Sequence, residues 1–164
     1  MAEWNVLFLC THNSARSILA EASLNALGQG RFRAFSAGSS PRENQQPNPL
    51  ALAVLDEAGY ATAGLSSKSW DVFAAAGAPA MDLVITVCDS AAGETCPVWP
   101  GHPATAHWSY ADPSEVQGSE RERKDAFRRT LQAIRQRIEL FVQLPPEQLQ
   151  KPRLQQAARA LAGR

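Results

Sequence analysis

The chain has 164 residues, with sixteen Lys and Arg against sixteen Asp and Glu, and three Cys. This length, with 45% apolar residues, suits one globular domain, and zero net charge argues against broad binding to nucleic acid or to an anionic membrane. The odd number of cysteines argues against a secreted disulfide scaffold. No stretch resembles a secretory leader or approaches the ~20 apolar residues of a membrane span, so we expect a cytoplasmic protein.

The N-terminal third of the chain alternates predicted strands and helices. Residues 4–9 are almost continuously apolar, which is typical of a strand buried on both faces. Residues 14–27 carry a helical apolar stripe that stops at Gly28, and residues 31–36 have the alternation of a second strand.

The middle of the chain contains two predicted helices and two predicted strands. Asn48 is a good N-cap with Pro49 in the first helical position, which predicts a helix that continues over 51–58. Further elements are predicted as a helix over 66–76, a buried strand over 81–87 and a short strand over 104–108.

The helix over 120–142 has the clearest pattern. Its large apolar residues recur at spacings of four and three on one face, Ser119 can cap its start, and Pro145-Pro146 ends it. The order of all these elements indicates an α/β domain with a mainly parallel sheet over 1–143, followed by a helical or frayed tail over 144–164.

The most informative segment runs from Cys10 to Ser17, between the first strand and the first helix. Backbone N–H groups in such a loop, together with the start of a helix, can bind an anion, and Arg16 offers a bidentate fork for a tetrahedral oxyanion. The same positive field should lower the pKa of Cys10 and make it a nucleophile, to which Ser17 can donate a hydrogen bond. Asn13 tolerates the left-handed backbone that a tight loop requires. The alternative is a small buried Cys10 and a surface Arg16.

This segment (Cys10-Thr11-His12-Asn13-Ser14-Ala15-Arg16-Ser17) resembles the phosphate-binding loop of the low-molecular-weight protein tyrosine phosphatase fold, and more narrowly that of the arsenate reductases with this fold. The resemblance extends over residues 4–142. It implies a single three-layer domain with a mainly parallel four-stranded sheet. Residues 85–97, with Cys88 and Cys96, are similar to the redox-cysteine segment of the thioredoxin-coupled reductases. Residues 107–113 are similar to the general-acid loop, which makes Asp112 the expected acid.

Three positions depart from the family pattern. His12 stands where phosphatases usually have Gly, and Ala15 where many members have a second Cys. Ser114 follows Asp112-Pro113, where eukaryotic-type phosphatases typically have Tyr.

The resemblance implies arsenic detoxification by reduction of arsenate to arsenite, with a disulfide cascade through Cys10, Cys88 and Cys96. A thioredoxin-like or glutaredoxin-type reductant would reset the protein, and phosphate or sulfate would act as substrate analogues. No nucleic acid or membrane partner and no required cofactor is expected, and the protein should be a monomer. The main alternative is a tyrosine phosphatase that uses Cys10, Arg16 and Asp112, and weak phosphatase activity is expected in either case. A non-catalytic oxyanion-binding module is a third possibility.

Chain order suggests that these residues meet. Cys10, Cys88 and Asp112 each follow a predicted strand, and ligands of open parallel sheets bind at the carboxyl ends of the strands. The three residues could therefore share one site if their strands are neighbours.

Two metal sites are conceivable. Some reductases of this family bind potassium, and four residues match those positions, although each also has an ordinary structural role: Asn13, Glu21, Ser36 and Asp71. A zinc site built from Cys88, Cys96, His102 and His107 is disfavoured, because the chain lacks a short Cys-x2–4-Cys knuckle.

Overall fold

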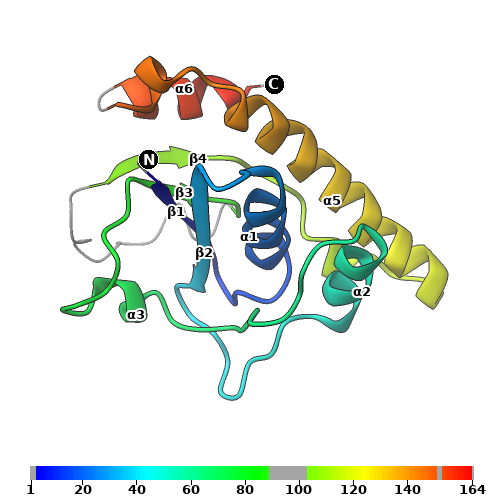
Figure 1. Cartoon of the computed structure of the whole chain (residues 1–164). Coiled ribbons are helices and arrows are strands. Elements are labelled where there is room, and N and C mark those ends of the chain that lie inside the picture. Colours follow the sequence, from blue (N-terminus) through cyan, green and yellow to red (C-terminus); the bar gives the residue numbers. More distant parts are fainter. Residues whose placement is uncertain (1–2, 89–102, 151–152, 164) are drawn as a thin grey trace.

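The computed structural model describes residues 3–88, 103–150 and 153–163. Its centre is a four-stranded sheet in the order β2-β1-β3-β4, and every pair of neighbouring strands is parallel (Figure 1). The strands are β1 (Trp4–Cys10), β2 (Phe32–Gly38), β3 (Leu83–Thr86) and β4 (Ala104–His107). The predicted parallel sheet is confirmed. Because β1 lies between β2 and β3, the segments that follow those two strands flank the carboxyl end of β1.

The helices follow the strands in chain order. Their bounds are α1 (Arg16–Leu27), α2 (Pro49–Glu57), α3 (Asp71–Ala74), α5 (Glu120–Val142) and α6 (Arg153–Leu161), with 3-10 helices η1 (Pro113–Glu115) and η2 (Pro146–Leu149). Both predicted N-caps are present: the Asn48 side chain accepts from Leu50 N–H, and Ser119 forms a capping box with Glu122. The prediction was wrong over 66–76, where only α3 is helical.

The sheet is buried on both faces, which makes three layers. Alternate residues of β1 point to opposite sides: Val6 and Phe8 join the larger apolar cluster with α1, α5 and α6, whereas Leu7 and Leu9 join a smaller cluster with Phe73 of α3. This arrangement explains why the β1 sequence is continuously apolar rather than alternating. None of the described helices is long and apolar enough to cross a membrane.

The segment after Pro145 packs against the domain. Leu149, Leu154 and Ala158 are buried in the larger cluster. The indole of Trp108, just past β4, donates to the carbonyl of Ala158 at 2.8 Å, and Arg159 Nε donates to the Thr105 carbonyl at 2.9 Å. The outer edge of β4 is therefore covered by α6.

Candidate functional site

The loop between β1 and α1 forms the floor of the site. Cys10 is the last residue of β1, and α1 begins at Arg16. The N-cap of α1 is Ala15, and within the described part of the chain no side chain caps this helix. The first-turn N–H groups of α1 therefore remain available to an anion at the positive end of the helix dipole.

The backbone of this loop is tightly curled. Asn13 has a φ of 56°, which confirms the predicted left-handed conformation. Gly38, at the end of β2, lies against the loop so closely that an added Cβ would be 2.6 Å from the Thr11 carbonyl oxygen. Gly38 lies beyond the strand predicted over 31–36, and a close approach between distant segments leaves no local signal in the sequence.

Cys10 is buried and lies beside Cys88. Neither residue is in a disulfide. The pKa of the Cys10 thiol is raised, first by its hydrogen bond with Cys88 and then by burial, while the Arg16 charge and the Thr11 backbone N–H act in the opposite direction. The predicted lowering of this pKa is wrong, because the neighbouring thiol and desolvation outweigh the guanidinium.

Cys88 reaches the site through the strand order. Leu9 of β1 is paired with Thr86 of β3, so the segments that follow these two strands leave the sheet side by side. Just past β3, the Val87 N–H donates to the Leu9 carbonyl at 2.9 Å. The Cys88 sulfur is 3.5 Å from the Thr11 hydroxyl. The neighbouring strands β1 and β3 therefore bring Cys10 and Cys88 together, as the chain order suggested.

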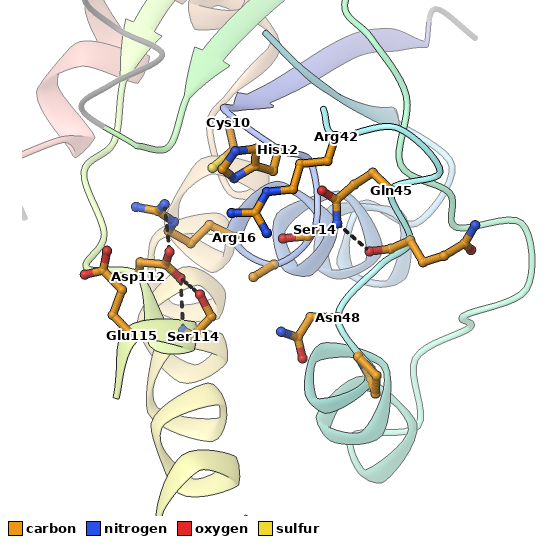
Figure 2. A pocket seen from close by; sticks show the side chains of 13 residues that line it. Cys10, His12, Ser14, Arg16, Arg42, Gln45, Asn48, Asp112, Ser114 and Glu115 are labelled. Atoms are coloured by element: carbon orange, nitrogen blue, oxygen red, sulfur yellow. Dashed lines mark hydrogen bonds and ion pairs between the residues drawn. The ribbon is translucent and has the colours of Figure 1, made fainter. Parts of the chain in front are cut away.

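Arg16 joins the loop to the segment that carries Asp112. Its guanidinium lies 3.6 Å from one carboxylate oxygen of Asp112 and donates to the Tyr110 carbonyl at 3.0 Å. The other carboxylate oxygen of Asp112 accepts from the Ser114 N–H at 2.9 Å and from its hydroxyl at 2.7 Å, which caps η1 (Figure 2). Asp112 is therefore held on the rim, facing the arginine.

A cavity of about 460 Å³ opens above Cys10. Figure 2 shows the side chains of His12, Arg42, Gln45 and Asn48 arranged around it opposite Asp112. The lining residues are Cys10, His12, Ser14, Ala15, Arg16, Arg42, Gln45, Gln46, Asn48, Pro49, Asp112, Ser114 and Glu115. None of these lining residues is Phe, Tyr or Trp.

Sequence reasoning missed the wall formed by residues 42–49. Arg42 adds a second guanidinium to the cavity, and Gln45, Gln46 and Asn48 add neutral polar groups. A polar loop without helical or strand periodicity gives no pattern that would single out these residues. They make the cavity suitable for a small, charged, strongly hydrogen-bonding ligand.

The remaining predicted residues are distributed as follows. Ser17 is fully buried, and its hydroxyl accepts from the Asn13 amide at 2.8 Å. The same amide donates to Ser36, and Ser36 donates to the Glu21 carboxylate, so these potassium-ligand candidates lie together. Asp71 is exposed at the start of α3.

Some residues of the disfavoured zinc set are not among the described residues. Cys96 and His102 lie outside the described residues. His107 ends β4, where its ring nitrogen lies 2.7 Å from the Thr86 hydroxyl. Among the described residues, no group of three or more His, Cys, Asp or Glu side chains could hold a metal ion.

A cysteine at the end of β1, an arginine at the start of α1 and an aspartate on a later loop form the pattern expected from the resemblance. The family model for low molecular weight phosphotyrosine protein phosphatase matches residues 5–155. The chain belongs to this family. Members share the phosphatase fold, so the match accounts for the sheet, the oxyanion loop and the position of Asp112.

Several relatives with similar sequences are named arsenate reductase. The arsenate reductase of Bacillus licheniformis is 34% identical over 143 residues, which is 87% of this chain and 98% of that protein. The solved arsenate reductase of Archaeoglobus fulgidus has a TM-score of 0.63 and 29% identity, covering 84% of this chain and 98% of its own. A thioredoxin-dependent arsenate reductase of Corynebacterium glutamicum has a TM-score of 0.56 and 28% identity, with 85% of this chain and 64% of that one covered.

Proposed function

We propose that this member of the phosphatase family reduces arsenate to arsenite through Cys10, Cys88 and Cys96. The observation that carries the proposal is that the thiols of Cys10 and Cys88, neither of them in a disulfide, lie side by side at the oxyanion site, with the Cys88 sulfur 3.5 Å from the Thr11 hydroxyl. Phosphoryl transfer needs one nucleophile, whereas reduction of arsenic by two electrons needs a second thiol close to the first. The relatives named arsenate reductase support the same choice.

The shape of the cavity supports a small oxyanion over a phosphotyrosine. The lining residues include no Phe, Tyr or Trp, and Ser114 occupies the rim beside Asp112. Aromatic rings prefer to stack on other rings, and among the described lining residues only the His12 imidazole offers a phenyl ring such a surface. Arsenate and phosphate have the same tetrahedral shape, so weak hydrolysis of small aryl phosphates is compatible with this site.

In the first step, the bound arsenate dianion accepts the Cys10 proton, and the resulting thiolate attacks arsenic to form a sulfur–arsenic bond. Arg16 and the N–H groups at the start of α1 hold the oxyanion. Asp112, on the rim beside Arg16, acts as the general acid that protonates the departing oxygen, which leaves as water.

In the second step, the Cys88 thiolate attacks the Cys10 sulfur. The sulfur–arsenic bond breaks, its electron pair stays on arsenic, and arsenite leaves while a Cys10–Cys88 disulfide remains. Cys96 then attacks Cys88, which frees Cys10 and leaves a Cys88–Cys96 disulfide. A thioredoxin-like or glutaredoxin-type dithiol then reduces the Cys88–Cys96 disulfide. The C. glutamicum relative is named thioredoxin-dependent, which favours a thioredoxin-like reductant. We place the reaction in the cytoplasm, where thiols are kept reduced.

The test compares arsenite formation and hydrolysis of p-nitrophenyl phosphate for the wild type and three serine variants. C10S should lose both activities. C88S should lose arsenite formation and keep hydrolysis. C96S should form about one arsenite per protein and then stop, because the Cys10–Cys88 disulfide is not passed on.

Each assay is run with a purified thioredoxin system and with a purified glutaredoxin system, which identifies the reductant. Multiple turnover by C96S at the wild-type rate would exclude the cascade. Hydrolysis of aryl phosphate without any arsenite from the wild type would favour the phosphatase alternative.

A further inference from the structure

A buried polar network fixes the oxyanion loop at Asn13. The side-chain amide of Asn13 donates to Ser17 at 2.8 Å and to Ser36 at 3.0 Å, and all three residues are fully buried. The Asn13 carbonyl accepts from the Ser67 hydroxyl at 2.5 Å, and the Asn13 side-chain oxygen accepts from the Lys68 N–H at 3.0 Å. The left-handed residue of the loop is thus held from three separate segments.

The network ends in a carboxylate. Ser36 donates its single hydroxyl proton to Glu21, which leaves the serine oxygen to accept from Asn13. Burial raises the pKa of Glu21, whereas the Ser36 hydrogen bond and the Lys68 charge act to lower it. A buried carboxylate needs a positive partner if it is to stay ionised.

Lys68 supplies that positive charge. Its ammonium group donates to the Ser36 carbonyl at 2.9 Å and to the Ser66 carbonyl at 2.7 Å. Burial lowers the pKa of Lys68, whereas the charge of Glu21 acts to raise it, so the two charges attract each other. The Lys68 carbonyl also accepts from Gly38 N–H at 2.8 Å. The backbone and the side chain of one residue therefore tie segment 66–70 both to the loop and to the end of β2.

These contacts occupy the oxygens that the resemblance assigns to potassium. Carbonyl and carboxylate oxygens are the groups that replace the hydration shell of that ion. Here the Asn13 side-chain oxygen and the Ser36 carbonyl already accept from Lys68, and Asp71 is exposed at the start of α3. The Lys68 ammonium would repel a potassium ion placed beside the Glu21 carboxylate, so the residues present do not fit that ion.

We propose that the Lys68 ammonium is a built-in cation that positions the oxyanion loop in place of a bound potassium ion. Lys68 acts through Asn13, Ser36 and Glu21, and it is a positioning residue. The inference rests on the proposed function only for the identity of the substrate, because the loop binds phosphate whether or not arsenate is reduced.

The test measures phosphate binding by calorimetry and thermal unfolding, each in potassium chloride and in choline chloride at equal ionic strength. The wild type should behave identically in the two salts. Lys68→Met keeps the length of the side chain and removes its charge. In choline it should bind phosphate about threefold more weakly, an effect of the size expected for loss of a partly exposed charge interaction. Potassium should restore part of that binding.

Lys124→Met is the matched control, because Lys124 pairs with Glu57 on the surface. It should bind phosphate like the wild type in both salts. A second variant, Lys68→Met with Glu21→Gln, removes both charges of the network and should show no response to potassium.

Tighter phosphate binding or a higher melting temperature of the wild type in potassium than in choline would overturn the proposal. So would wild-type phosphate binding by Lys68→Met in choline. If Lys68→Met folds only in potassium, the proposal is supported, and if it folds in neither salt, the double variant and the wild-type comparison decide. A failure of arsenate reduction alone would count against the proposed function and leave this result standing.

Discussion

At the residue scale, the decisive feature is a pair of thiols that share one environment. Cys10 and Cys88 come from the ends of two neighbouring strands and lie side by side. Each thiol therefore affects how easily the other loses its proton. This pairing distinguishes the site from one with a single activated cysteine, where the arginine and the helix start alone would set the pKa.

Replacement of Cys88 by Ala should lower the pKa of Cys10, because it removes the contribution that raises this pKa most. At a pH below that pKa, the thiolate fraction of Cys10 rises, and its alkylation by iodoacetamide should become faster than in the wild type. The rate against pH is measured on the Cys10 peptide by mass spectrometry. At high pH, where Cys10 is ionised in both proteins, the two rates should converge. A profile displaced to higher pH in the variant would contradict this assignment.

The oxyanion loop itself could be predicted because its signals are local. A continuous apolar strand, a polar turn and a helical stripe lie within residues 4–27, and a left-handed Asn13 follows from the same stretch. Lys68 and Gly38 could not be predicted as part of the site. Their roles depend on contacts with residues tens of positions away, and such contacts leave no periodic pattern.

At the element scale, tertiary contacts override local pattern in segment 66–70. Its sequence predicted a helix that continues to residue 76, yet the Lys68 N–H donates to the Asn13 side chain instead of to a helical carbonyl. Ser69 forms a parallel bridge with Gly38. Satisfied hydrogen bonds to the loop and to β2 replace those of a helix, which is why only α3 remains helical.

The C-terminal helix α6 contributes to stability through its buried face. Leu154→Ala should lower the free energy of unfolding by ~2–5 kcal/mol, because Leu154 is buried in the larger cluster and its loss leaves a cavity. Gln156→Ala, on the exposed face of the same helix, should change it by less than ~0.5 kcal/mol.

Urea denaturation followed by circular dichroism gives both values. Equal effects of the two substitutions would show that α6 does not pack in solution as it does here. Phosphate binding by folded Leu154→Ala should be unchanged, since α6 covers β4 and does not line the cavity.

At the scale of the whole molecule, a net charge of zero must be reconciled with an anionic ligand. The positive groups that face the cavity are local, namely Arg16, Arg42 and the start of α1. Long-range attraction of anions requires an excess of positive charge over much of the surface, which this chain lacks. Selection of the ligand therefore takes place inside the cavity, by contact.

The KM for arsenate should accordingly change little, by about twofold or less, between low and high choline chloride, because direct contacts in a partly enclosed site are screened weakly. Phosphate and sulfate should compete with arsenate at every salt concentration, because they occupy the same groups. Steady-state kinetics over a range of salt concentrations provide the measurement. A KM that rises steeply with salt would instead indicate long-range attraction.

The residues of the site are far apart in the sequence, so they become available at different times while the chain is being synthesised. Cys10 is near the start of the chain, but Thr11 meets Cys88 only across 77 positions of sequence, and Arg16 meets the Tyr110 carbonyl only across 94. During synthesis, a chain that ends before β3 carries the nucleophile without the second thiol or the acid. Under the proposed function, Cys10 can form its disulfide with Cys88 only after β3 has been added beside β1.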